Sequence, residues 1–347
     1  MKTLRDYTVS ELATILKDLG EPAYRAKQIF KWLNLGVSSY DEMTDIPKSL
    51  REKLRPIYRV EPPMLAKRQI SKDGTRKYLW QLADGNCVET VLMCYKHGYS
   101  VCVSTQVGCR MGCVFCASTK GGLVRNLTGG EILEEVIFVA KDAGVRISNI
   151  VLMGTGEPLD NMDNVLKFIE LVNSEDGLNL GQRHISLSTS GLCDKIDLLA
   201  DKKLQITLSV SLHAPFDDLR TEIMPVNRAY SLARLIESCD RYLKLTGRRI
   251  SFEYSMIRGF NDTPACAQKL ADLVGGTINH VNLIPLNSID ESPLKPSLPQ
   301  DVERFKAILE KRGITTTVRR QLGYDIDASC GQLRRKYQQQ KNGGVNT

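Results

Sequence analysis

Gly108-Cys109-Arg110-Met111-Gly112-Cys113-Val114-Phe115-Cys116 is the stretch that decides the fold, because it places three cysteines in a CxxxCxxC spacing. Three thiolates on one short loop can hold three corners of a cubane iron–sulfur cluster and leave the fourth iron open. An open iron can bind a substrate or cofactor directly, whereas a structural site closes every position. The spacing therefore predicts a [4Fe-4S] cluster on Cys109, Cys113 and Cys116.

A structural zinc site is the main alternative for these cysteines. Structural zinc is almost always four-coordinate and usually shows two ligand pairs in the sequence. Cys102 and Cys330 reach the loop only if the chain folds back. The spacing favours the cluster and leaves zinc as the alternative. None of the four histidines lies close to the cysteines; they are His97, His184, His213 and His280.

The composition is that of an ordinary globular protein. The chain has 347 residues, of which 42% are hydrophobic and 25% are charged, enough for one barrel-sized domain and a small additional one. The sequence holds no apolar run long enough to span a bilayer and no signal peptide. Ten cysteines in such a chain indicate a reducing compartment, so we expect a cytoplasmic protein with no membrane partner.

Positive charge is concentrated at the two ends of the chain. Residues 1–77 contain 16 Lys and Arg against 10 Asp and Glu, and residues 319–347 contain 6 against 2. The net charge of the whole chain is +7, so its middle is slightly negative. Basic ends around a near-neutral body are typical of proteins that bind nucleic acid. Solubility and a frayed basic tail are the alternative explanation.

Residues 1–60 are predicted to form a small helical domain with a basic, RNA-binding surface. Thr8 and Glu11 have the spacing of a capping box ahead of an apolar helical face, and Pro22 suits the first position of a second helix. Residues 61–95 are predicted to be a linker and a β-hairpin extension. Its turn is Asp84-Gly85, a pair that favours tight hairpins.

Residues 96–330 are predicted to form an α/β core, followed by a basic tail at 331–347. Strand patterns alternate with helix patterns in this region, which predicts a parallel sheet. Six such units predict a partial (β/α)6 barrel, in which active groups gather at the carboxyl ends of the strands. The expected strands are 99–104, 147–153, 184–188, 206–211, 250–254, 280–284 and 315–319, and the expected helices are 131–141, 164–172, 232–245, 265–273 and 301–311.

Polar residues and glycines follow several of these strands. Glycines let the backbone approach a ligand closely, and a glutamate can accept hydrogen bonds from an ammonium group. Each strand end alone is weak evidence, but several of them opposite a cysteine loop predict a ring of cofactor-binding groups. The candidates are Gly156, Glu157, Ser188, Ser211, Leu212, His213 and Asn287.

Two further cysteines are candidates for chemistry. Cys330 lies between Ser329 and Gly331 in a polar stretch, which suits an exposed, reactive thiol better than a core position. Cys102 lies on the strand that leads into the cysteine loop, on the same predicted face as Ser104. Cys102 faces the site if that face lines the barrel; a buried structural cysteine is the alternative.

Together these motifs resemble the RlmN family of radical S-adenosylmethionine (SAM) methyltransferases, which modify carbon 2 of adenine in RNA. The resemblance covers nearly the whole chain. It implies a radical SAM barrel, a [4Fe-4S] cluster on the three loop cysteines, and SAM bound by the strand-end residues. Its most specific parts are residues 106–116, 122–127, 154–158, 188–191, 211–215 and 325–333.

The resemblance also implies a mechanism that consumes two SAM molecules per methylation. One SAM methylates Cys330 by displacement. The second, cleaved at the cluster, gives a 5′-deoxyadenosyl radical that removes a hydrogen atom from the S-methyl group, and the methylene radical adds to carbon 2. Glu89 matches the position of the proton acceptor. Cys102 matches the cysteine that releases the product by forming a disulfide with Cys330.

The implied substrates are an adenosine in the peptidyl-transferase region of large-subunit rRNA and the adenosine 3′ to the anticodon in some tRNAs. Both lie in structured RNA, so the base must leave its stack to enter a pocket. The implied partners include an electron donor such as flavodoxin or ferredoxin, and we expect a monomer.

Three other functions remain open from the sequence. The related Cfr family methylates carbon 8 of the same rRNA base, although Glu157-Pro158-Leu159 favours carbon 2. A zinc-dependent RNA-binding module predicts zinc without iron and gives Cys330 no role. A radical SAM enzyme for a small metabolite has no need for the basic ends.

Overall fold

A single large sheet runs through the centre of the molecule. The computed structural model describes residues 1–286, 294–320, 322–323, 325–326, 333–334 and 337. In it ten strands follow the order β14-β13-β12-β11-β10-β9-β6-β5-β4-β3. The strands from β6 to β14 are parallel. They are β6 (Gly98–Cys102), β9 (Ile147–Leu152), β10 (Ile185–Thr189), β11 (Thr207–Ser211), β12 (Ile250–Met256), β13 (His280–Pro285) and β14 (Thr315–Val318).

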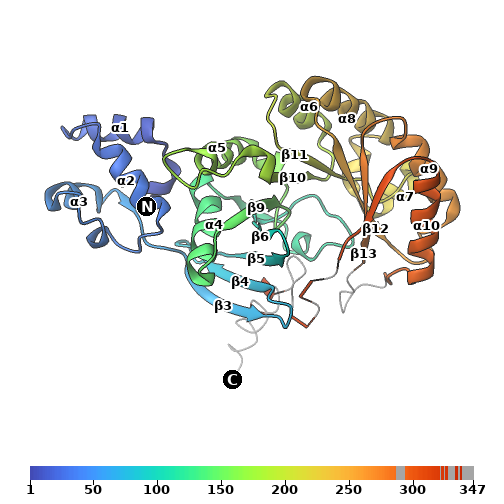
Figure 1. Ribbon diagram of the computed structural model, residues 1–347, viewed down its shortest axis with the longest axis horizontal. Coiled ribbons are helices and arrows are strands. Elements are labelled where there is room, and N and C mark those ends of the chain that lie inside the picture. Colours follow the sequence, from blue (N-terminus) through green and yellow to red (C-terminus); the bar gives the residue numbers. More distant parts are fainter. Residues whose placement is uncertain (287–293, 321, 324, 327–332, 335–336, 338–347) are drawn as a thin grey trace.

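Helices connect the parallel strands and cover the outer face of the sheet (Figure 1). This arrangement confirms the predicted partial barrel. The sequence did not predict α6 or α7, since neither begins with a side-chain cap and each is shorter than the others. The helices are α4 (Gly129–Ala143), α5 (Met162–Asn173), α6 (Cys193–Asp201), α7 (Asp217–Ile223), α8 (Leu232–Thr246), α9 (Pro264–Val274) and α10 (Pro299–Lys311).

Three antiparallel strands extend one edge of the barrel. They are β3 (Met64–Ile70), β4 (Arg76–Gln81) and β5 (Cys87–Tyr95). The sequence predicted β4 and β5 with their turn, where Gly85 has φ of +84°, but it predicted a linker in place of β3. This edge strand is largely exposed and rich in long polar side chains, so it lacks the apolar alternation that identifies a strand.

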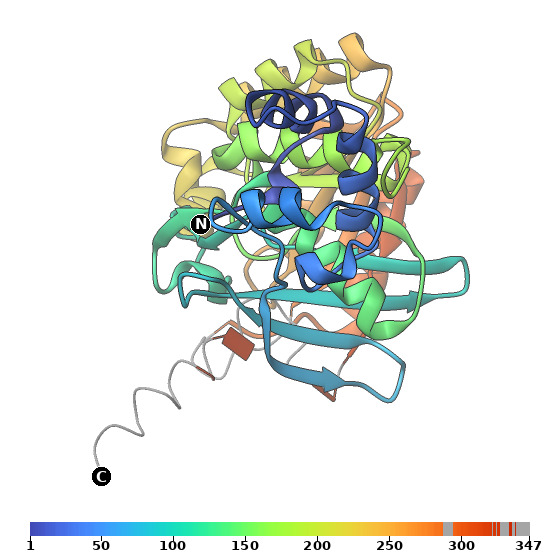
Figure 2. The ribbon, with the colours of Figure 1, turned by 90° about the vertical axis from the view of Figure 1, so that its left-hand side faces the viewer.

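Three helices form the N-terminal domain: α1 (Val9–Asp18), α2 (Arg25–Asn34) and α3 (Lys48–Leu54). The capping box is present, since the Glu11 N–H donates to Thr8 Oγ1 and the Thr8 N–H donates to Glu11 Oε2 at 2.7 Å. These helices lie beside α4 and α5, at the end of the molecule that faces the viewer in Figure 2. No helix in the described part of the chain is long and apolar enough to cross a bilayer.

A buried ionic cluster joins the helical domain to the barrel. Glu134 of α4 accepts a bidentate pair from Arg59 at 3.0 and 2.9 Å and a hydrogen bond from Thr3 Oγ1 at 2.6 Å. Arg5 lies 3.6 Å from the same carboxylate and donates to backbone carbonyls of the helical domain. Separating the helical domain from the barrel would leave these buried charges unpaired, which is costly. The cluster therefore holds the two parts together.

Candidate active site

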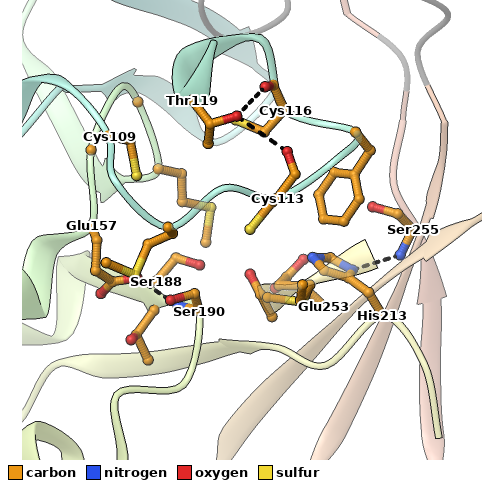
Figure 3. Close-up of a pocket in the computed structure, with 18 of the residues that line it drawn as sticks. Cys109, Cys113, Cys116, Thr119, Glu157, Ser188, Ser190, His213, Glu253 and Ser255 are labelled. Carbon is orange, nitrogen blue, oxygen red and sulfur yellow. Dashed lines mark hydrogen bonds between the residues drawn. The ribbon is translucent and has the colours of Figure 1, made fainter. Parts of the chain in front are cut away.

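The three loop cysteines lie between β7 (Gln106–Gly108) and β8 (Leu123–Asn126), at the carboxyl end of the parallel strands. The loop can close only because Gly108 has φ of +81° and a Cβ there would lie 2.0 Å from the Gly122 carbonyl oxygen. The Thr119 hydroxyl is within hydrogen-bond distance of the carbonyls of Cys113 and Cys116, at 3.2 and 2.9 Å (Figure 3). These contacts fix the loop around the thiols.

The loop thiols are shielded from water. Cys109 and Cys113 are buried and Cys116 is half-buried. Burial raises the pKa of Cys109 to about 12 and also raises the pKa of Cys113. Metal ligation requires thiolates, so binding a cluster here releases protons. The thiols are near enough to one another that each of these two pKa values is further raised by Cys116.

This donor set fits a cubane cluster. In a cubane each thiolate binds a different iron, so the three sulfur atoms need not converge on one point. Within the described residues, no group of three or more His, Cys, Asp or Glu side chains is arranged to hold a single metal ion. The loop cysteines nevertheless line one shared cavity.

The opposite side of the cavity begins at Gly154–Glu157, directly after β9 (Figure 3). The buried carboxylate of Glu157 accepts hydrogen bonds from the backbone N–H groups of Leu159 at 3.0 Å and Ser190 at 2.7 Å. The backbone N–H of Glu157 donates to the side-chain oxygen of Gln106. Burial raises the pKa of Glu157, and these N–H donors oppose that shift. The carboxylate is therefore fixed in position beside the cysteine loop.

Replacing Gly156 with alanine is expected to destabilise the fold and disturb this wall. Gly156 has φ of +116°, and a Cβ would lie 2.7 to 2.8 Å from Gln106 atoms. We expect a loss of about 2–4 kcal/mol in the free energy of unfolding, measured by urea denaturation. Gly247→Ala is the control, because its φ is also positive but its surroundings are open; it should cost about 1 kcal/mol. Equal losses would contradict the close approach at Gly156.

His213 occupies the wall after β11 in an unusual backbone conformation, with φ of +56°. Its Nδ1 accepts the Ser255 N–H at 2.9 Å, so the ring proton of the neutral form resides on Nε2. The imidazole packs edge-on against Phe115 of the cysteine loop, with ring centroids 4.8 Å apart. Burial lowers the pKa of His213 to about 3. The ring is therefore a neutral part of the pocket wall.

His213 should make the protein sensitive to acid. Its folded-state pKa lies below its unfolded value, so as pH falls the unfolded chain takes up the proton first. Between pH 7 and pH 5 the wild type should lose roughly 2 kcal/mol of unfolding free energy that His213→Asn does not lose. Asparagine tolerates positive φ and offers an oxygen near the Nδ1 position. Parallel pH profiles in urea denaturation would show that His213 titrates normally.

A cavity of about 280 Å³ lies between the cysteine loop and the strand ends. It brings together most of the cofactor-binding candidates from the sequence: Gly156, Glu157, Ser188, Ser211 and His213. Leu212 is not among the described residues that line the cavity, because its side chain lies in the core and its N–H donates to the Glu253 carbonyl oxygen at 3.1 Å. Asn287 and Cys330 lie outside the described residues.

Several site residues were missed from the sequence. Ser190, Glu253, Ser255 and Arg319 also line the cavity. A fifth residue that the sequence did not reveal is Arg220 of α7, which is buried behind the cavity wall. It donates to the carbonyls of Ser190 and Ser211 at 2.7 and 3.1 Å and so ties two strand ends together. Burial lowers the pKa of Arg220 to about 10. The alternation of polar residues along β12 was the available signal for Glu253 and Ser255.

Comparison with known proteins agrees with this geometry. Residues 103–273 match the family model of the radical SAM superfamily, and residues 2–60 match that of the ribosomal RNA large subunit methyltransferase N-terminal domain. A protein of Desulforamulus reducens described as a probable dual-specificity RNA methyltransferase RlmN is 53% identical over 96% of both chains. The chain belongs to the RlmN family of radical SAM methyltransferases.

Other members and a solved structure give the same result. An RlmN protein of Clostridium perfringens is 53% identical over 97% of this chain and 98% of its own. The crystal structure of a radical SAM methyltransferase from Sphaerobacter thermophilus superposes with a TM-score of 0.92 at 45% identity, covering 96% of this chain and 99% of that one. As an RlmN-family radical SAM RNA methyltransferase, the protein uses a [4Fe-4S] cluster and SAM.

The other two candidate residues lie on neighbouring strands, Glu89 on β5 of the β-extension and Cys102 on β6 of the barrel. Val91 of β5 lies directly opposite Cys102 of β6, and Glu89 stands two residues before Val91 on the same face. Cys102 is buried in a cluster that includes Leu322 and Met153, and Met153 also lines the cavity. Cys102 and Glu89 therefore share the face of the sheet that continues into the cavity beside the cysteine loop.

Glu89 is held in a buried, charged environment. It is 3% exposed, and its Oε2 lies 2.9 Å from Nζ of Lys77, whose side chain is fully buried. Its Oε1 accepts the Arg334 N–H at 2.5 Å. Leu333 packs against Leu79 and Cys87 nearby. The described residues just after position 330 thus contact the same sheet face as Glu89.

Proposed function

We propose that the protein methylates carbon 2 of adenine in large-subunit rRNA and in some tRNAs, through an S-methyl group carried on Cys330. One observation supports this most strongly. Residues on both sides of position 330 in the sequence, Leu322 and Leu333, pack on the sheet face that bears Cys102 and Glu89. The proposed carrier thus lies, along the sequence, between two residues that contact this face.

The cofactors are assigned to the cavity by its donors. Cys109, Cys113 and Cys116 would hold the cluster, and Glu157, Gly156, Ser188, Ser211, His213 and Asn287 would hold SAM. When bound, this pair supplies the hydrogen-atom abstraction that activates an unreactive methyl group. Glu157, whose carboxylate is held by two N–H donors, would accept from the SAM ammonium group, and Gly156 would leave room for it. Two SAM molecules are used in each methylation, one of them to methylate Cys330.

Cys102 and Glu89 are assigned to product release. The radical adduct must lose one electron, with the cluster as its acceptor. Glu89 takes the proton from carbon 2, and the Cys102 thiolate then attacks the Cys330 sulfur, which still carries the methylene bridge to carbon 2. The S–CH₂ bond breaks as the Cys102–Cys330 disulfide forms, the former methylene carbon keeps the electron pair and takes up a proton to become the methyl group, and a reductant must reopen the disulfide. The Lys77 ammonium group and the Arg334 N–H would hold Glu89 in one orientation while it acts. The buried position of Cys102 beside Met153 supports this role, since it keeps the thiol next to the pocket and away from bulk oxidants.

The helical domain, residues 1–60, is assigned to RNA binding. Tyr24 at the start of α2 is 61% exposed, with the Arg25 guanidinium 5.1 Å from its ring centroid. Lys27 and Lys31 are exposed on the same helix. A stacked aromatic with adjacent cations suits an unpaired base and its phosphates. Binding should weaken steeply as salt rises.

The remaining assignments follow from this function. The protein acts as a cytoplasmic monomer and receives electrons from a donor such as flavodoxin or ferredoxin. Residues 61–95 are the linker and β extension, residues 96–330 are the radical SAM core, and the basic residues 331–347 add to the RNA-binding surface.

Nucleoside analysis tests the proposal and separates it from its rivals. The anaerobically reconstituted protein is incubated with SAM, a reductant and an unmodified rRNA fragment or tRNA, beside a fragment with guanosine at the target position. We expect 2-methyladenosine from both adenosine substrates and none from the control. Formation of 8-methyladenosine would assign the chain to Cfr-type chemistry. A protein with zinc, no iron and no product would be an RNA-binding module.

A further inference from the structure

Five polar side chains form a closed ring of hydrogen-bond contacts on the inner face of three neighbouring strands, where Glu253 is buried and Thr317 is exposed. They are Ser251 and Glu253 of β12, His280 and Asn282 of β13, and Thr317 of β14, hereafter the polar ring. Ser251 Oγ lies 3.1 Å from Glu253 Oε1 and 3.0 Å from His280 Nδ1. Thr317 Oγ1 lies 2.9 Å from His280 Nε2 and 3.0 Å from Asn282 Oδ1. Asn282 Nδ2 closes the ring at 2.8 Å from Glu253 Oε2.

The polar ring has more contacts than its neutral donors can fill. Its five contacts need five hydrogens. Asn282, Thr317 and Ser251 each place one hydrogen in the ring, and a neutral His280 places one more. With Glu253 ionised, one contact is therefore left with two acceptors facing each other. If the ring is filled by its own members, the fifth hydrogen is the carboxyl proton of Glu253 or a second imidazole proton.

We propose that the polar ring binds one titratable proton and holds Glu253 as a neutral carboxylic acid in the wall of the SAM pocket. In this state Glu253 Oε1–H donates to Ser251, Ser251 donates to His280 Nδ1, and His280 Nε2–H donates to Thr317. Thr317 then donates to Asn282, and Asn282 donates back to Glu253 Oε2. Each of the five contacts then contains one hydrogen, and the cycle runs in one direction.

The surroundings of the polar ring favour this neutral form. Burial raises the pKa of Glu253 and lowers the pKa of His280, so both effects oppose the ion pair. Two charged groups face the ring. Arg319, after β14, lowers the pKa of Glu253, and Arg249, before β12, lowers that of His280. Ser209 of β11 also hydrogen-bonds the carboxyl of Glu253.

The proton matters to the cofactor pocket because Glu253 lines it (Figure 3). SAM carries a carboxylate, and the pocket already holds the buried carboxyl of Glu157. A neutral Glu253 adds no second negative charge there, and it keeps β12, β13 and β14 joined at the pocket. Glu253 is thus a positioning residue for SAM. This inference rests on the family's cofactor pocket and not on which RNA carbon is methylated.

Glu253→Gln is the matched test, since glutamine has the shape and the donor of the protonated acid. Infrared difference spectra of wild type against this variant, at pH 7 and without cofactors, should contain the carbonyl stretch of one buried carboxylic acid. An ionised carboxylate difference band would overturn the proposal.

Thermal unfolding gives a second readout. A folded-state pKa above the unfolded value means that wild-type stability falls as pH rises between the two, whereas the variant has no such loss. From pH 5 upwards the wild-type midpoint should fall relative to Glu253→Gln by roughly 2 °C per pH unit. Glu237→Gln is the control, because the Glu237 side chain is 73% exposed. Its unfolding midpoint should show no such trend with pH relative to wild type.

A third measurement keeps the test valid if Glu253→Gln fails to fold. Ser251→Ala leaves Glu253 in place but removes the acceptor of its proton, so the acid band should shift and titrate at lower pH than in wild type. An unchanged band in Ser251→Ala would contradict the shared ring.

Discussion

Cys330→Ala is expected to abolish RNA methylation while leaving the cofactor pocket intact. A covalent carrier has no substitute in the chain, so the rate of product formation should fall by at least roughly 10³-fold. Iron content and SAM binding should match wild type, because the described residues that line the cavity belong to other segments. Counting methylated nucleosides per enzyme in an anaerobic assay measures the effect.

Cys94→Ala is the matched control for the carrier. Cys94 is a half-buried cysteine of β5 in the β-extension. It is not among the described residues that line the cavity. Its replacement should change the methylation rate by less than about twofold. Full activity in Cys330→Ala would remove the carrier from the mechanism and favour direct transfer.

Cys113→Ala is expected to remove the cluster. Replacing a residue that hydrogen-bonds to a metal ligand commonly lowers metal affinity by about 10–100-fold. Losing a ligand itself should therefore lower cluster affinity by more than about 100-fold. The variant should be colourless after reconstitution, with background iron and no methylation. Cluster loss should be read by iron analysis and by visible absorbance, so that the result does not depend on activity.

Cys266→Ala controls for the loss of a buried cysteine. Cys266 of α9 is 3% exposed and packs in the main core away from the cavity. Cys266→Ala should lower the free energy of unfolding by about 1 kcal/mol and leave the iron content unchanged. Equal iron loss in both variants would mean that Cys113 acts through the fold and is no ligand.

The parts of the fold with strong local signals were predictable from the sequence. The strands β9 to β13 and helices such as α4 and α8 carry regular apolar periods and clear caps. The cysteine loop was predictable because its three ligands lie within eight residues. Glu157 followed from its place directly after a strand.

Other features depend on long-range packing and have no local signal. Ser251, Glu253 and Ser255 alternate with apolar residues along β12, a pattern that normally indicates a face in contact with water. In a partial barrel the polar face instead turns inward around a cofactor cavity, so the same pattern marks the site. Arg220 resembles any charged helix residue until its burial is seen.

The most direct test of the central claim is deuterium counting with SAM that carries a CD₃ methyl group. Removal of one hydrogen atom from the S-methyl group of Cys330 should leave two deuterium atoms in the RNA methyl group and one in 5′-deoxyadenosine. Mass spectrometry of the nucleosides reads both products from one anaerobic reaction. Three deuterium atoms in the RNA methyl group would contradict the account, because an intact methyl group would then have been transferred directly.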